Sequence, residues 1–351
     1  MRVVVVGASG NVGTAVLRRL RDDGTVTSVV GIARRTPRTT PPPPYDVASW
    51  VPVDIGARVP DDEVVADLAR AFAGADAVVH LAWAIQPSHD RRRLADVNVT
   101  GTRRVLEAVV RAGVPHVVAA SSVGAYAPAP DDVPRSEGWA TDGVRSSQYS
   151  VDKAAQERLL DEYEETHPDL AVARLRPALI FQRAAGHEIT GLFLGPFVPE
   201  RLLGGKVPVL PWPAGVRLQA VHADDVGSAY REAVVRQVRG AFNIAAPQVL
   251  HAEDVARVVG GEDTPVREVP VPVVRAALAT AWHARVVPVG PGWLDMAVNA
   301  PILDTSRAER ELGWRASWSG VDALRDVVEG MVDGAGTASP PLLPRRLPRR
   351  R

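Results

Sequence analysis

A tyrosine and a lysine four positions apart, in Tyr149-Ser-Val-Asp-Lys153, are the residues of this chain best suited to proton transfer. In a helix this spacing places both side chains on one face, one turn apart, and Ser146 or Ser147 can cap the start of such a helix. A free phenol has a pKa of about 10 and is a poor base at neutral pH. We therefore expect the Lys153 ammonium to lower the pKa of Tyr149 and so make it an acid/base group.

A serine is expected to reach the same place. Ser121 and Ser122 end the apolar run that begins at Pro115, which reads as a buried strand. From that strand end Ser122 can bond a substrate oxygen while Tyr149 moves the proton. Only two of the 41 basic residues are lysines, so keeping Lys153 indicates that a compact ammonium is needed there. The alternative to a catalytic pair is an exposed Tyr/Lys pair on a helix without catalytic function. It stays open because this spacing is common by itself.

The element that must position a partner for this chemistry is the N-terminus. Four valines, Val3 to Val6, read as a central parallel strand, since they are β-branched and too few for a buried helix. Gly7, Gly10 and Gly13 follow at three-residue spacing, which permits a tight turn and close approach of a phosphate to the start of the next helix. Together these features predict a dinucleotide-binding loop rather than a merely structural turn, and a cationic nicotinamide there would further favour the phenolate form of the tyrosine.

The end of the second predicted strand, residues 25–33, bears on the choice of cofactor. An acidic residue at this place bonds a ribose 2′-hydroxyl, whereas arginine neutralises a 2′-phosphate. Here Arg34 and Arg35 follow the strand, so we expect NADP, with NAD as the alternative if the two arginines are only a solvated pair. After the third strand, Asp54 is placed to hold an adenine amino group.

The alternation of strands and helices predicts an α/β fold with a doubly wound parallel Rossmann sheet and a smaller C-terminal substrate-binding lobe. His80 precedes the end of its predicted strand and is expected to be a packed residue rather than a catalyst. The predicted strands are 2–6, 25–33, 50–53, 76–81, 115–122, 171–177 and 241–245; the predicted helices are 12–20, 61–72, 89–112, one opening near 147, 270–284, 304–312 and 320–331.

Composition excludes several function classes. The chain has 351 residues with 41 basic and 41 acidic side chains and no cysteine, which argues against nucleic acid or anionic membrane as a partner and excludes disulfides and thiolate-bound metals. We expect no metal cofactor. No apolar run is long enough to span a membrane, and Gly7 interrupts the N-terminal valines too early for a signal sequence. We therefore expect a soluble, cytoplasmic protein acting on a small-molecule substrate.

As a set, the motifs resemble those of the extended short-chain dehydrogenase/reductases, also called the NAD-dependent epimerase/dehydratase family. The resemblance runs from Arg2 to about Met331 and rests on 7–13, Asp54-Ile55, His80-Leu-Ala-Trp83, Asn98-Val-Thr-Gly-Thr102, 121–126, 149–153, Arg176-Pro177, 221–226 and 304–314.

This resemblance implies roles for individual residues. It makes Ser122, Tyr149 and Lys153 the catalytic triad, with Asn98 in support. It implies cofactor contacts from Gly7, Ser9, Gly10, Asn11, Val12, Gly13, Arg34, Arg35, Asp54, Ile55, Leu81, Ala82, Trp83, Asn98, Ser121, Tyr149, Lys153, Pro177 and Ile180.

The resemblance also implies a domain organisation. It implies a nucleotide domain over residues 1–177 with returns near 216–247, a lobe from 178–215 and 248–335, and a possible homodimer. Residues 336–351, rich in proline and arginine, are expected to form a disordered basic tail.

The family's usual nucleotide-sugar signals are incomplete in this chain. The acidic pair that follows the catalytic serine in 4,6-dehydratases is replaced by Val123-Gly124, and Pro177 stands where the best-known 4-epimerases have asparagine. Arg217 lies one place away from a phosphate-clamping position. Trp83, Trp212, Trp282 and Trp293 suit an apolar or ring-bearing substrate, or form lobe core.

Three functions therefore stay open. The first is an NAD(P)-dependent reductase or dehydrogenase that acts on a ketone or secondary alcohol. The second is a nucleotide-sugar epimerase with retained cofactor, and the third is a non-catalytic NAD(P)-binding sensor.

Overall fold

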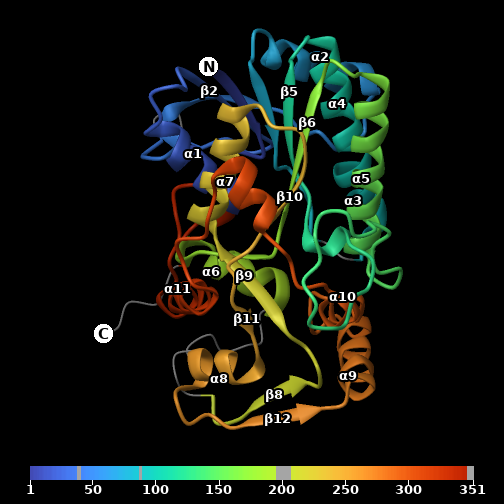
Figure 1. Cartoon of the computed structure of the whole chain (residues 1–351), viewed down its shortest axis with the longest axis vertical. Helices are drawn as coiled ribbons and strands as arrows, with labels where there is room; N and C mark the ends of the chain where they lie inside the picture. The colour runs from blue at the N-terminus through green and yellow to red at the C-terminus, as the bar shows by residue number, and fades with distance from the viewer. Residues whose placement is uncertain (38–40, 87–88, 195–206, 346–351) are drawn as a thin grey trace.

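The molecule is organised around one sheet of seven parallel strands, in the order β10-β6-β5-β4-β1-β2-β3 (Figure 1). The computed structural model describes residues 1–37, 41–86, 89–194 and 207–345. The strands of this sheet are β1 (Arg2–Val6), β2 (Ser28–Ala33), β3 (Ala48–Pro52), β4 (Ala77–His80), β5 (His116–Ala120), β6 (Ala171–Pro177) and β10 (Gly240–Ile244). The predicted doubly wound parallel sheet is confirmed.

Helices cover both faces of this sheet, which is why the central strand is apolar on both sides. Val3 and Val5 pack with helices α1 (Asn11–Arg21) and α7 (Ala223–Arg236). Val4 and Val6 face the opposite core, formed with α2 (Asp61–Phe72), α4 (Gly101–Arg111) and α5 (Gln148–Thr166). All four valines are at most 1% exposed, so the uninterrupted valine run is explained by burial on two faces.

The strand order reverses between β1 and β4, and this reversal opens a crevice at their carboxyl ends. Most predicted boundaries fall within a few residues of the observed ones. β2 begins later than expected, at Ser28, because the Asp23 carboxylate accepts the Thr25 amide in a turn (2.7 Å). The long helix predicted over 89–112 is α3 (Arg91–Ala95), a π-helical turn (Asp96–Thr100) and α4 in succession.

The C-terminal half adds a lobe below the carboxyl edge of the sheet, where Figure 1 shows α8, α9, β8 and β12. Two small sheets, β11-β9-β7 and β12-β8, form its frame. No described helix has both the length and the apolarity needed to cross a membrane. The elements of this half are β7 (Leu179–Phe181), α6 (Gly186–Ile189), β8 (Leu210–Pro213), β9 (Leu218–His222), β11 (Val249–Leu250), α8 (Ala252–Gly260), β12 (Val266–Val269), α9 (Val271–His283), α10 (Gly292–Asn299) and α11 (Gly320–Asp333).

The segment expected to be a disordered tail is packed over its described part, so that expectation is wrong for residues 336–345. Ser339 is fully buried and donates to the Ser9 carbonyl (2.6 Å). The Thr337 hydroxyl bonds the Tyr45 hydroxyl (2.6 Å), and Leu342 is 1% exposed. Composition misled the prediction here, because one leucine and two hydroxyls are enough to anchor a proline-rich segment. The remaining residues, 346–351, lie outside the described part of the chain.

Replacing Leu342 by alanine tests this packing. Leu342→Ala is expected to lower the free energy of unfolding by about 2–4 kcal/mol, because it leaves a cavity under the segment. The neighbouring Leu343 is 53% exposed, and Leu343→Ala is expected to change it by less than about 0.5 kcal/mol. Urea unfolding followed by circular dichroism measures both; equal effects would show that the segment is not packed.

Candidate active site

The glycine loop between β1 and α1 is shaped by two close backbone approaches. Gly7 has φ +91°, and a Cβ atom there would lie 2.6 Å from the Ala82 amide nitrogen. A Cβ on Gly13 would lie 2.4 Å from the Gly7 carbonyl oxygen. Gly10 is the N-cap of α1 and offers no side-chain cap, so the amides of the first helical turn stay available to an anion. This cradle fits the pyrophosphate of a dinucleotide.

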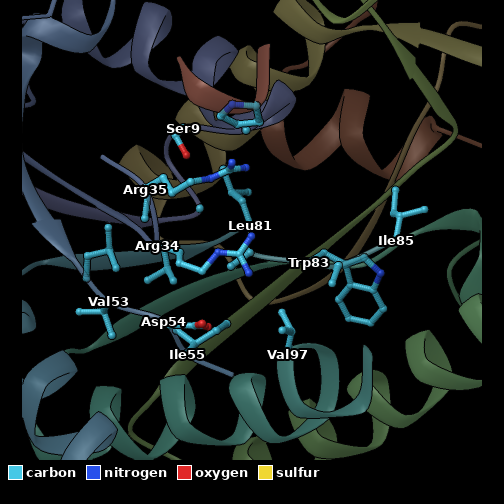
Figure 2. Close-up of a pocket in the computed structure, with 18 of the residues that line it drawn as sticks. Ser9, Arg34, Arg35, Val53, Asp54, Ile55, Leu81, Trp83, Ile85 and Val97 are labelled. Atoms are coloured by element: carbon cyan, nitrogen blue, oxygen red, sulfur yellow. The ribbon is translucent and has the colours of Figure 1, made fainter. Parts of the chain in front are cut away.

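A cavity of about 400 Å³ runs from this loop along the carboxyl ends of β1, β2 and β4 (Figure 2). Its size and its place at the strand reversal suit a nucleotide cofactor. The predicted cofactor residues that line it are Gly7, Ser9, Gly10, Arg34, Arg35, Asp54, Ile55, Leu81, Ala82 and Trp83.

Charged side chains stand at one end of this cavity. Figure 2 shows Arg34 and Arg35 reaching into it between Ser9 and Asp54. Both arginines are exposed, and within the described residues neither forms an ion pair. Asp54 is different, because its carboxylate already pairs with Arg93 (2.9 Å) and accepts the Gly56 amide (3.1 Å). Two unpaired guanidinium groups thus face the cavity, while the one carboxylate beside them is neutralised.

Tyr149 lies in the first turn of α5, which Ser147 caps by accepting the Ser150 amide. The Ser122 side chain lies near its phenol and acts to lower the pKa of that group. Ser122 also accepts the Gly124 amide (3.0 Å), and a Cβ on Gly124 would lie 2.8 Å from the Tyr149 ring. The structure therefore brings the predicted serine and tyrosine together. Gly124, two residues after the serine, has no side chain and so leaves room for the tyrosine ring.

Lys153 lies one turn further along α5 and is 2% exposed. Its ammonium donates to the Ala120 carbonyl (2.7 Å) and to Gln156 Oε1 (3.0 Å), and it lies 3.5 Å from the ring centre of Trp83. These contacts use all three directions in which the ammonium can donate. Burial lowers the pKa of Lys153 to about 7, although Glu157 and Asp152 oppose the shift.

The expected effect of Lys153 on Tyr149 is not what the structure shows. Burial raises the pKa of the Tyr149 phenol, and the nearby Ser122 side chain opposes this only in part. The reason is that Lys153 points to other partners and, with its own pKa near neutrality, carries only part of a charge. In this arrangement Tyr149 is a neutral phenol at pH 7 and is suited to donate a proton.

Trp83 separates Tyr149 and Lys153 from the cofactor cavity. Its ring packs edge-on against Tyr149 at 6.0 Å between centroids, with Lys153 over its face. Trp83 lines the cofactor cavity, whereas Tyr149 lines a second cavity of about 160 Å³. The two cavities share Ala84 and Ile85 in their walls. The buried Trp83 N–H has no hydrogen-bond partner within the described residues.

Asn98 fixes the loop segment that lies between the two cavities. Its side chain accepts the Ala84 amide (2.8 Å) and donates to the Ala84 carbonyl (2.9 Å) and to Asp152 (3.3 Å). It is 1% exposed and lies in the π-helical turn. Asn98 is therefore a buried polar residue that fixes the backbone next to Trp83.

A buried ion pair beneath the site escaped the sequence-based analysis. Glu157 is fully buried and receives two hydrogen bonds from Arg176, both at 2.8 Å, and one from Ser121. Burial would raise the pKa of Glu157, but the bonds with Arg176 outweigh it and the pKa is lowered. Its helical spacing of four from Lys153 was a usable signal. Its partners on β6 could not be identified without the fold.

The other predicted residues take indirect positions. Nine of the predicted cofactor residues do not line the cofactor cavity: Asn11, Val12, Gly13, Asn98, Ser121, Tyr149, Lys153, Pro177 and Ile180. Asn11 instead bonds Gln182 through its side chain and backbone. Arg217 pairs with Asp132 (2.7 Å) rather than facing either cavity.

Two further residues discussed above, His80 and Trp212, are packed. His80 is a packed strand residue that bonds Thr102 (3.0 Å), as predicted, and burial lowers its pKa to about 3. Trp212 packs in the lobe core. Among the described residues, no cluster of His, Asp or Glu is placed to hold a metal ion.

Several residues of the cofactor cavity wall were not predicted. Glu188, Leu192 and Pro341 reach it from the lobe and the C-terminal segment, and burial raises the pKa of Glu188 to about 7. Their distance in sequence from the glycine loop left no local signal. The other unpredicted lining residues are Val6, Ile32, Ala33, Val53, Ala84, Ile85, Gln86, Arg93 and Val97.

Comparisons with known proteins agree with this geometry. The sequence profile of the NAD dependent epimerase/dehydratase family matches residues 3–245. An uncharacterized protein of Mycobacterium tuberculosis is 27% identical over 329 residues, which cover 93% of this chain but 29% of that longer protein. A UDP-glucose 4-epimerase of Mycolicibacterium smegmatis is 28% identical over 345 residues, covering 94% of this chain and 98% of that protein.

Solved structures show the same fold. The Thermus thermophilus UDP-glucose 4-epimerase in complex with NAD superposes with a TM-score of 0.68 at 21% identity. The match covers 94% of this chain and 99% of that one.

The lowered pKa of Lys153 predicts a specific dependence of stability on pH. Between pH 7 and pH 9 the unfolded chain keeps this proton, while the folded chain loses it, so stability rises with pH. Lys153→Met is expected to remove about 2 kcal/mol of that rise. Urea unfolding at the two pH values measures it. Arg158→Met, which removes an exposed charge from the same helix, should keep the rise; its loss in both variants would contradict the assignment to Lys153.

Proposed function

The chain belongs to the NAD dependent epimerase/dehydratase family, and from this premise we propose that it is an NAD(P)-dependent oxidoreductase acting at a ketone or secondary alcohol. The observation that carries the proposal is the grouping of Ser122 and Tyr149, with Lys153 one turn along, near a glycine-cradled cavity. This grouping supports a proton donor at the edge of the sheet where a cofactor would lie.

The proposed reaction uses Tyr149 as the acid in reduction. A bound nicotinamide cofactor supplies the hydride. With such a cofactor bound, Tyr149 would give its proton to the carbonyl oxygen as the carbon–oxygen π bond breaks, and solvent would then return a proton to Tyr149. Ser122, which lies near the phenol, can bond the same oxygen. Burial raises the pKa of the phenol, so at neutral pH Tyr149 is in the protonated form that the reductive direction requires.

The same proposal gives the cofactor as NADP, with NAD as the alternative. Arg34 and Arg35 follow β2 and face the cavity without carboxylate partners among the described residues. A 2′-phosphate there would gain two guanidinium contacts. Asp54, which lines the same cavity, is held by Arg93 and is less free to receive a ribose hydroxyl.

Trp83 places one requirement on this proposal. The nicotinamide end of a cofactor has to approach Tyr149, and the indole of Trp83 lies in that path. Trp83 belongs to the loop after β4, outside any helix or strand, and its N–H has no described partner. Turning the ring away therefore breaks a cation–π contact but no hydrogen bond, and it frees an N–H of Lys153 for a ribose.

A nucleotide-sugar epimerase is the second candidate, favoured by the names of the relatives described above. The two candidates differ in cofactor use, because an epimerase restores its cofactor within each turnover whereas a reductase consumes it. Loss of NADPH absorbance in step with product therefore supports the reductase. Cofactor binding without turnover of any substrate would leave a binding-only role, which the position of Trp83 permits.

Removing the phenol oxygen tests the assignment of Tyr149. Tyr149→Phe is expected to lower kcat by roughly 10²- to 10⁴-fold, because proton transfer is lost, with the Kd of NADPH unchanged within about threefold. Tyr163→Phe is the matched control, since Tyr163 lies near the far end of the same helix and stacks on His167. Unchanged turnover in Tyr149→Phe would refute the acid/base role.

Removing the two arginines tests the cofactor. In the double variant Arg34→Ala/Arg35→Ala the Kd of NADPH is expected to rise roughly 10- to 100-fold, because the contacts to the 2′-phosphate are lost. The Kd of NADH should change by less than about threefold. Arg92→Ala removes an exposed arginine outside the cavity wall and should alter neither. Fluorescence titration gives both constants, and equal losses for both cofactors would contradict NADP preference.

A further inference from the structure

We propose that the second cavity takes an uncharged ketone or alcohol that carries an apolar ring and no phosphate. This inference rests on the proposed function and names its substrate class. The cavity holds the Tyr149 side chain in its wall and has a volume of about 160 Å³. Its remaining walls are of two kinds, one aromatic and one polar.

The aromatic wall comes from helices α9 and α10. Trp293 lies 4.8 Å from the Tyr149 ring between centroids, and Phe193 packs edge-on against Trp293 at 4.9 Å. Trp282 reaches the same cavity from α9, stacked on His89 at 4.2 Å. Two indoles and a phenol therefore surround the space next to the proposed acid, and aromatic faces of this kind bind ring-bearing ligands.

The aromatic wall is held in place by close packing. A Cβ on Gly292 would lie 2.4 Å from the Ser146 carbonyl oxygen, so the start of α10 lies directly against the loop before α5. Met296, one turn along α10, would lie 2.9 Å from a Cβ on Gly124. Trp293 is therefore positioned before a ligand arrives, which limits the entropy lost on binding.

The polar wall offers few free groups. Asn98 is bonded to Ala84 and Asp152, and Gln148 Nε2 donates to Asp152 (2.6 Å). Ser147 is used as the cap of α5. A sugar ring needs partners for several hydroxyl groups, and a buried hydroxyl without a partner costs binding free energy. A wall whose polar groups are already paired with one another suits an apolar ring better.

The cavity also lacks a built site for a diphosphate among the described residues. Its one cationic side chain, Arg91, donates to Gln148. Two other arginines of this region are paired, Arg275 with Asp295 (2.9 Å) and Arg217 with Asp132 (2.7 Å). At about 160 Å³ the cavity is also smaller than the usual site for a ligand as large as a nucleotide sugar. Charge and size thus agree with the aromatic lining.

The test compares benzylacetone with butanone, which has the same reacting group but no phenyl ring, and with UDP-glucose. The full-length enzyme with NADPH is expected to prefer benzylacetone. Trp293→Leu should lower kcat/KM for benzylacetone roughly 10- to 100-fold, because the aromatic contact is lost, and for butanone by less than about threefold. Trp282→Leu, on the other helix, provides a second variant if the first does not fold.

Trp139→Leu is the matched control. Trp139 is 36% exposed, lies outside the cavity wall and contacts Arg135, so its loss should leave both ketones unaffected. A drop in kcat/KM that is equal for the two ketones in Trp293→Leu and in Trp282→Leu overturns the inference.

Calorimetry without NADPH separates this inference from the proposed function. Benzylacetone binding that depends on Trp293, with no oxidation of NADPH by either ketone, supports the substrate class and refutes the proposed reaction. Binding of UDP-glucose in preference to benzylacetone overturns the substrate class, whichever reaction follows.

Discussion

The site depends on a carboxylate, Glu157, that is buried in the interior. Glu157 has no exposed surface and would be costly to bury as an ion by itself. Arg176 and Arg174 from β6, with Ser121 from the end of β5, supply the opposing charge and hydrogen bonds. Through Glu157, these bonds attach α5 to two neighbouring strands, β5 and β6, near their carboxyl ends. Tyr149 and Lys153, two turns and one turn before Glu157, are thereby held at the carboxyl edge of the sheet.

The burial that encloses this ion pair also affects the protonation of Lys153 and Tyr149. The same burial lowers the pKa of Lys153 and raises that of Tyr149. Both shifts favour neutral groups, so the pair is not an ammonium beside a phenolate. Charge brought in by a ligand would change this balance, because an opposite or like charge in a medium of low dielectric acts strongly. The chemistry is therefore coupled to what fills the two cavities.

The two cavities meet at a short stretch of chain that belongs to neither a helix nor a strand. Asn98 pairs with both backbone groups of Ala84 and so fixes this stretch, while the Trp83 side chain occupies the space between Lys153 and the cofactor cavity. Parts distant in sequence complete the walls: α10 lies on Tyr149, and Pro341 of the C-terminal segment lines the cofactor cavity near Ser9. Helix α10 and the C-terminal segment thus form walls of the site, although both are far from the glycine loop in sequence.

What the sequence determined by itself was local. Backbone sterics and the burial of one face act over a few residues. Local patterns therefore predicted β1 from its valine run, the loop from the glycines after it, and α2 from its helical period. For the same reason the tyrosine, the lysine and the serine could be named, and the parallel sheet was predicted with its strands in place.

Only the tertiary structure decided the rest, because the deciding contacts join residues far apart in the chain. The sign of the Tyr149 pKa shift follows from burial by segments from both halves of the chain. The pairing of Arg217, the packing of Leu342 and the placing of Trp83 against Lys153 all depend on partners that no local pattern identifies. Desolvation and side-chain packing are properties of the folded surroundings, and spacing along the sequence does not contain them.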